Sequence, residues 1–186
     1  MSRRLAKRWI TADEYERMGE AGIFGEDARL ELLEGEIYEM SPIGSPHAAC
    51  VKYLNVLFNR LFSGRLLVGV QDPIRLDDFS EPQPDIALLH GRDDFYRHAH
   101  PKPNDVLLVI EVADSTVETD RSYKIPLYAK AGIQEAWLVN LPDERIELYA
   151  EPVGGVYQIS RNFNRGEEVQ SHTVADLRAN VSEGLG

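Results

Sequence analysis

The pattern of apolar and polar positions predicts a long helix in the first third of the chain. From His47 to Phe62, apolar residues recur at spacings of three and four: Val51, Leu54, Phe58 and Leu61. Such spacing places the side chains on one face of an α-helix, because the helix repeats every 3.6 residues. We therefore expect this helix to pack its apolar stripe against a hydrophobic core.

Two shorter elements are expected ahead of this helix. Residues 11–14 (TADE) have the pattern of a capping box, a threonine followed three residues later by a glutamate, which predicts a short helix. Residues 30–40 alternate loosely between apolar and polar and contain the turn sequence Glu34-Gly35, which predicts a β-hairpin. Two prolines and a glycine between residues 42 and 46 then separate the hairpin from the long helix.

The remaining apolar positions lie mostly in short runs that are typical of strands. Val106–Ala113 gives the strongest pattern, because only one of its residues is charged, as in the interior of a sheet. A helix is expected from about Thr119 to Ala131, ended by Gly132. Further strands are expected at 66–76 (interrupted by Pro73), 85–89, 136–140, 145–150 and 156–163, and the last two should form a hairpin. Polar loops are expected at 77–84 and 91–105, and a short helix after Val174.

This mixture of strands and helices around a central apolar strand predicts an α/β (α+β) fold, a mixed β-sheet flanked by helices in two or three layers. The chain has 186 residues and shows no internal repeat, low-complexity tract or linker. We therefore expect a single domain over residues 1–186, large enough to bury a substantial core.

Composition places the chain among ordinary globular proteins, with 43% hydrophobic and 27% charged residues. Its one cysteine, Cys50, excludes an internal disulfide and agrees with a reducing compartment. No apolar run approaches the roughly 20 residues that a membrane helix needs, and no long apolar segment follows the basic N-terminus to make a secretory signal. We expect a cytoplasmic protein with no membrane partner.

The formal net charge of −11 is a handicap for one class of function. Proteins that bind nucleic acid usually carry a basic surface, because contacts to phosphate supply much of their affinity. An acidic surface repels a duplex unless metal ions or a local basic patch offset it.

Glu111 is the charged residue within the apolar run 106–113. An ionised carboxylate inside a sheet costs several kcal/mol unless it is paired, hydrogen-bonded or bound to a metal ion. Two interpretations are open here. The residue is either a solvated or arginine-paired glutamate near the end of the strand, or a functional carboxylate.

Asp85 makes the second interpretation more attractive. It follows Pro84, which favours an extended entry into the apolar strand at 85–89, although Pro-Asp is also a common turn sequence. If the strands that carry Asp85 and Glu111 pair, their carboxylates can converge on one hard cation, which prefers oxygen ligands. The backbone carbonyl of Val112 would be a natural third ligand.

Asp120 and Lys124 lie four residues apart on the predicted helix and therefore share a face. Taken alone, they suggest a surface ion pair that stabilises the helix by a few tenths of a kcal/mol. The functional interpretation places Lys124 over the metal site, where an ammonium can orient an attacking water and stabilise developing negative charge.

Several of these motifs together resemble the Uma2 family, a group of bacterial proteins in the PD-(D/E)xK restriction-endonuclease-like superfamily. The resemblance covers roughly residues 10–150. It rests on Glu31-Leu32-Leu33-Glu34-Gly35-Glu36-Ile37, Ser41-Pro42, His47, Pro84-Asp85, Glu111-Val112-Ala113-Asp114-Ser115-Thr116, Asp120, Lys124, Tyr128 and Gly132-Ile133-Gln134-Glu135-Ala136-Trp137-Leu138-Val139.

The resemblance implies roles for individual residues. Asp85 and Glu111 would bind the metal ion, and Glu31 would be a helper acid from the N-terminal region. The standard motif has a lysine two positions after the glutamate, where this chain has Ala113, so Lys124 of the following helix would supply the ammonium. Weaker candidates are His47, Gln71 and Asp120. For His47 the alternative is that it only caps and packs its helix, and for Gln71 that it only hydrogen-bonds the backbone.

The function implied is Mg²⁺-dependent (or Mn²⁺-dependent) hydrolysis of phosphodiester bonds, with DNA the expected partner rather than RNA. Two alternatives stay open. A catalytically degenerate nuclease fold could serve as a binding or regulatory module, as the net charge and the displaced lysine favour. A hydrolase of small phosphorylated molecules would not be hindered by an acidic surface. A homodimer is also expected, because the C-terminal hairpin offers strand edges that a second copy could cover.

Overall fold

A computed structural model describes residues 6–25 and 27–185. Its centre is a six-stranded mixed sheet with strand order β3-β4-β5-β6-β7-β8. Neighbouring strands are antiparallel except β5 and β6, which are parallel and are joined by a helical crossover. The strands are β3 (Leu66–Val70), β4 (Ile86–His90), β5 (Val106–Ala113), β6 (Glu135–Asn140), β7 (Arg145–Val153) and β8 (Val156–Asn164).

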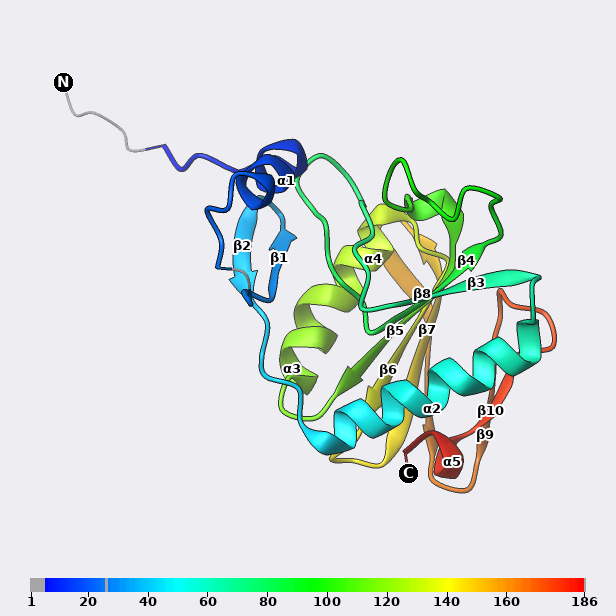
Figure 1. Cartoon of the computed structure of the whole chain (residues 1–186). Helices are drawn as coiled ribbons and strands as arrows, with labels where there is room; N and C mark the ends of the chain where they lie inside the picture. The colour runs from blue at the N-terminus through cyan, green and yellow to red at the C-terminus, as the bar shows by residue number, and fades with distance from the viewer. Residues whose placement is uncertain (1–5, 26, 186) are drawn as a thin grey trace.

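Helices cover the two faces of this sheet (Figure 1). On one face lies α2 (Ser45–Phe62), whose buried side chains share a core with Leu108, Ile110 and Val112 of β5. On the other face lies α4 (Ile125–Ala131), which shares a second core with Val109 and Ala113. Successive side chains of a strand point to opposite faces, so Glu111 belongs to the face that α4 covers.

The crossover helix contains a wider turn. It begins with α3 (Val117–Thr119), continues through a π-helical turn, η2 (Asp120–Lys124), and leads into α4 without a break. Gly132 ends it in the left-handed conformation, with φ of 84°, as a helix C-terminus commonly requires. Such π turns are rare and often occur at functional sites.

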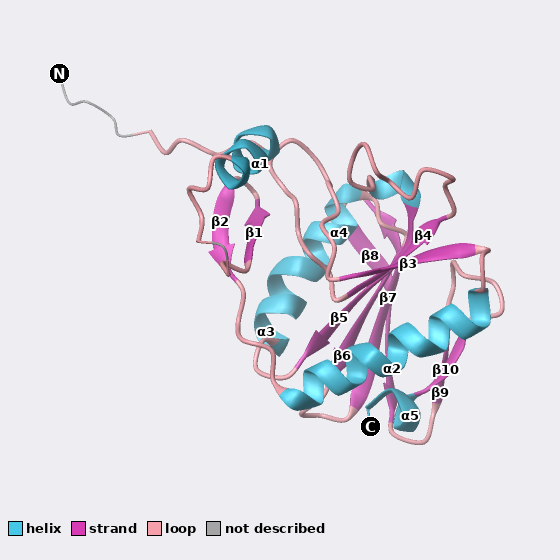
Figure 2. Cartoon of the chain, in the orientation of Figure 1, coloured by secondary structure: helices cyan, strands magenta, loops and turns pink. Residues whose placement is uncertain are grey.

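The N-terminal region forms a small unit beside the main sheet (Figure 2). It contains α1 (Ala12–Glu20) and the hairpin of β1 (Leu30–Leu33) and β2 (Glu36–Glu39). Glu34 and Gly35 at the turn have φ of 47° and 81°, as a two-residue type I′ turn needs. A β-bridge between Leu32 and Glu81 ties the hairpin to the chain that enters β4.

The C-terminal region adds elements that the hydrophobic pattern does not predict. A hairpin of β9 (Glu168–Gln170) and β10 (Arg178–Asn180) precedes α5 (Val181–Leu185). Each of these strands buries only its middle residue, Val169 or Ala179, which leaves too short a pattern to recognise. The expected C-terminal helix is present as α5, although it starts later than Val174.

The expected fold class is confirmed, and most expected elements are present within a few residues. Three local predictions were wrong. Leu61 is 38% exposed and Phe62 takes its place in the buried stripe of α2. The strand expected at 66–76 ends at Val70, ahead of Pro73, and the crossover helix starts at Val117 rather than Thr119. No helix among the described residues is long and apolar enough to cross a membrane.

Candidate active site

Asp85 and Glu111 are brought together by the register of two antiparallel strands. Ile86, the first residue of β4, pairs with Ile110 of β5, so continuing this register by one residue places Asp85, which directly precedes β4, opposite Glu111. Residues opposite each other in an antiparallel pair project to the same side. Both side chains are buried, with exposed fractions of 6% and 3%, and both line one pocket.

Asp85 is held by three donors. His47 Nε2 lies 3.0 Å from Oδ2, the backbone N–H of Val112 donates to the same oxygen at 2.9 Å, and Gln71 Nε2 donates to Oδ1 at 3.0 Å. Burial opposes ionisation, but the hydrogen bond and charge of His47, with the other donors, lower the pKa of Asp85 below its ordinary value. The carboxylate is therefore ionised at neutral pH.

His47 and Gln71 thus contact a site acid directly. The hydrogen bond to Asp85 raises the pKa of His47, against the effect of burial, and His47 Nδ1 is buried with no hydrogen-bond partner among the described residues. Gln71 has a positive φ of 56°, a conformation that costs a non-glycine residue energy and tends to occur at functional sites.

Glu111 is held by the crossover helix. Lys124 Nζ lies 2.9 Å from Glu111 Oε1, and the hydroxyl of Tyr128 donates to the same oxygen. Burial, together with the negative charges of Asp120, Asp85 and Glu31, raises the pKa of Glu111 to about 8, although Lys124 opposes this. The protein thus holds Glu111 where its negative charge is poorly compensated.

Lys124 is buried, with an exposed fraction of 4%. Burial alone would lower its pKa, but Glu111, Glu31 and Asp120 raise it above the ordinary value. The ammonium also lies 3.2 Å from Glu31 Oε2. Lys124 is therefore positively charged and bridges the sheet and the N-terminal hairpin.

Glu31 and Asp120 complete the group of acids. Glu31 projects from β1, and one of its oxygens accepts a hydrogen bond from the backbone N–H of Gln83 at 3.3 Å. Asp120 accepts one from Thr116 Oγ1 at 2.6 Å. Burial raises the pKa of Asp120, against the effects of Lys124 and Thr116. The interpretation of Asp120 and Lys124 as a surface ion pair is wrong, because both are buried.

The pocket in front of these side chains has a volume of about 560 Å³. Four buried acids, Glu31, Asp85, Glu111 and Asp120, line it with the single ammonium of Lys124. Their oxygens are the ligands that hard divalent cations prefer, and negative charge exceeds positive. The donor chemistry therefore suits a divalent metal ion, although no three of these acids have ligand atoms within 4.8 Å of one another. Val112 contributes its N–H to Asp85, and the role of its carbonyl stays a prediction.

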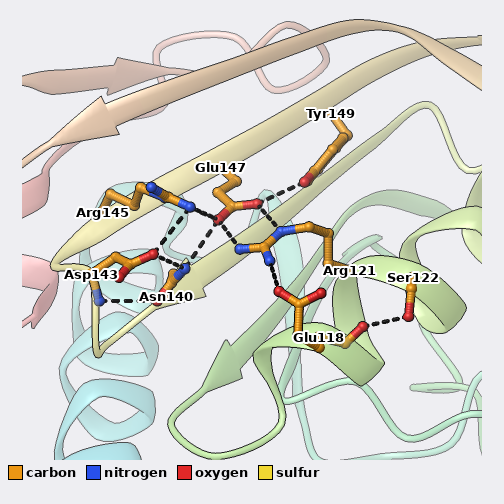
Figure 3. Close-up of polar contacts among 8 residues, drawn as sticks. All are labelled: Glu118, Arg121, Ser122, Asn140, Asp143, Arg145, Glu147 and Tyr149. Atoms are coloured by element: carbon orange, nitrogen blue, oxygen red, sulfur yellow. Dashed lines mark hydrogen bonds and ion pairs between the residues drawn. The ribbon is translucent and has the colours of Figure 1, made fainter.

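Two features of this region were not predicted from the sequence. Tyr128 was given no role, although it lies four residues after Lys124 and so on the same helical face. The second feature is a network beside the pocket, in which Arg121 of η2 reaches Glu147 of β7 (Figure 3). Arg121 and Glu147 are 26 residues apart, and no local sequence pattern links them.

Comparison with known proteins gives a family and a solved structure of similar fold. A model of the Uma2 family, described as "Putative restriction endonuclease", matches residues 12–182. A crystal structure from Anabaena variabilis ATCC 29413, described as a putative nuclease belonging to DUF820, superposes with a TM-score of 0.74 at 16% identity, covering 95% of this chain and 97% of that one. Identity at this level shows a common fold. No curated protein matches the chain.

Proposed function

The chain belongs to the Uma2 family, and from this premise we propose that it is a metal-dependent endonuclease that hydrolyses phosphodiester bonds, with DNA as substrate. The observation that supports this most is the buried group of Asp85, Glu111 and Lys124, which lines one pocket. Perturbed pKa values gather at functional sites, and those of Glu111 and Lys124 are both raised.

Asp85 and Glu111 would hold Mg²⁺, or Mn²⁺ in its place. When bound, the ion would polarise the scissile phosphate and lower the pKa of a coordinated water. The oxygen-only donor set suits either ion. Asp85 is already ionised and oriented by His47 and Gln71, so it offers a fixed ligand before the metal ion arrives.

Lys124 would act on the phosphate and the attacking water. Its ammonium is fixed between Glu111 and Glu31, which keeps it charged and aimed at the same pocket. A fixed positive charge stabilises negative charge that develops on a phosphate in the transition state. Glu31 is then a positioning residue, because in this structure it touches the lysine.

Variants that remove the charge of one acid at a time would test the proposal. We expect Asp85→Asn and Glu111→Gln to reduce Mg²⁺- or Mn²⁺-dependent cleavage of plasmid and linear DNA below detection. Asp114→Asn is a matched control, because Asp114 lines the same pocket but is exposed, and it should cleave at nearly the wild-type rate. Circular dichroism would confirm that all three variants fold.

The outcome also distinguishes the alternative function. If the wild-type protein cleaves neither single- nor double-stranded DNA with either metal ion, the enzymatic proposal is wrong. A binding or regulatory role, which the net charge of −11 favours, would then be the better account. Cleavage that survives in both acid variants would equally refute the assigned residues.

A homodimer in the cytoplasm belongs to the same proposal. β8 and β3 are the two edges of the main sheet, and β8 exposes Val156 at 63%. Exposed strand edges are natural sites for pairing with a second copy. Light scattering coupled to size-exclusion chromatography should give a mass near twice 21.0 kDa, and a monomer would refute the dimer.

A further inference from the structure

A second group of metal-ligating side chains lies away from the active-site pocket. Glu16 of α1, Glu81 of the segment between β3 and β4, and His100 of the 91–105 loop each place one ligand atom within 4.8 Å of the other two. No other such group of three carboxylate, histidine or cysteine side chains occurs in the part of the chain that the structure describes. Glu16 and His100 also line a hollow of about 720 Å³.

Backbone hydrogen bonds bring the three segments together independently of these side chains. The N–H of Ala12 at the start of α1 donates to Asp78 O at 2.8 Å, and the N–H of Glu81 donates to Leu32 O of β1 at 2.7 Å. The N–H of Arg75 donates to Pro101 O, next to His100, also at 2.8 Å. The convergence of the three ligands therefore follows from the fold.

Glu81 is the observation that points to a ligand. It is only 2% exposed, and its Oε2 is buried without a hydrogen-bond partner among the described residues. A buried carboxylate oxygen without a donor or cation is costly.

Arg75 contacts one member of the group, Glu16, but its shortest ion pair is with Asp13, outside the group. Its guanidinium contacts Asp13 at 2.6 Å, whereas Glu16 and Asp78 both lie at 3.7 Å. One arginine therefore faces four carboxylates, of which Glu81 receives no ion pair. Arg97 and Lys102 also line the hollow, but among the described residues no ion pair joins either of them to Glu81.

We propose that Glu16, Glu81 and His100 form a zinc site that fastens α1 and the 91–105 loop to the segment entering β4. Two carboxylates and one imidazole match the mixed oxygen and nitrogen donors that Zn²⁺ accepts, whereas Mg²⁺ favours oxygen alone. Zinc binds such atoms at about 2.0–2.2 Å, so the three side chains need to close slightly around the ion. This site is independent of the proposed nuclease activity.

Zinc binding is measured on the full chain after removal of metal ions, by competition with a chromophoric chelator. The Asp85→Asn/Glu111→Gln double variant serves as the starting protein, because it removes the acids of the active-site pocket. We expect one zinc ion per chain. His100→Ala should weaken binding at least about tenfold, and Glu81→Gln should do the same. His98 also places an imidazole on the lining of this hollow, so His98→Ala is the matched control and should bind zinc as tightly as the starting protein does.

Tryptic cleavage after Arg97 gives a second measurement. Zinc should slow cleavage in the starting protein and in His98→Ala, but not in His100→Ala, because only an anchored loop is protected. His100 is exposed, so its variant is expected to fold. Equal zinc affinity in His100→Ala and His98→Ala, or no zinc binding at all, would overturn the proposal. Neither measurement depends on DNA cleavage.

Discussion

Two buried carboxylates on the main sheet have pKa values that are shifted in opposite directions. Glu147 of β7 is 2% exposed and accepts hydrogen bonds from Arg121, Arg145, Asn140 and Tyr149 (Figure 3). Burial would raise its pKa, but these partners lower it to about 2. Glu111 of β5 is 3% exposed, yet its pKa is raised to about 8.

The difference lies in the ratio of cations to anions around each carboxylate. Two guanidinium groups contact Glu147, and each also contacts a more exposed acid, Glu118 or Asp143. Glu111 has only the ammonium of Lys124, which it shares with the buried Glu31. Arg121 and Lys124 come from the same π turn, so one turn of helix contributes to a well-paired carboxylate on one side and to a poorly paired one in the pocket on the other.

The largest expected effect is on the pocket. Lys124→Met should reduce DNA cleavage by about 10²–10³-fold, because the ammonium that we propose stabilises the phosphate is lost. Lys130→Met is the matched control, since Lys130 lies on the same helix and its ion pair with Glu34 is exposed. Cleavage rates at saturating Mg²⁺ would measure both. If the two variants cleave equally well, the assignment of Lys124 is wrong.

The next largest effect is expected at Glu147 and its hydrogen-bond partners. The folded pKa of Glu147, about 2, lies below its ordinary value of 4.5, so its ionisation stabilises the fold by about 3 kcal/mol. This stabilisation is complete above about pH 4.5 and is lost as the pH falls toward 2. Urea unfolding at pH 7 should show Glu147→Gln destabilised by about that amount. At pH 3 the difference from wild type should shrink, and an unchanged difference would contradict this account.

The smallest effect tests the excess of negative charge in the pocket. Burial raises the pKa of Asp120, so its ionised form costs stability above the folded pKa. Asp120→Asn should therefore raise the free energy of unfolding of the metal-free protein by about 1 kcal/mol and lessen the stabilisation that Mg²⁺ adds. Asp114→Asn should change little, because Asp114 is exposed. A loss of stability in Asp120→Asn would show that Asp120 is well compensated.

The sequence predicts the sheet better than its surroundings. Val106–Ala113 is found with the expected bounds, because a strand that is buried on both faces must be apolar almost throughout. The same pattern makes Glu111 stand out as the charged exception. The strand that carries Glu111 and the strand that follows Asp85 are successive in the sequence, and this favours their pairing. Short strands such as β9, which buries only Val169, have no comparable pattern.

The partners of the acids were harder to predict. Lys124 was assigned through a family resemblance, since the position expected for the lysine is Ala113. Tyr128 and Arg121 act across the interface between helix and sheet, where side chains meet by packing geometry rather than sequence spacing. The π turn is also invisible in the sequence, because η2 contains no glycine or proline.

The placement of Lys124 in η2 has a consequence for control of the protein. Glu111 belongs to the sheet and Asp85 directly precedes β4, while the ammonium is carried by the crossover helix, which Arg121 ties to Glu147. Displacement of that helix would withdraw the positive charge and leave both acids in place on the sheet.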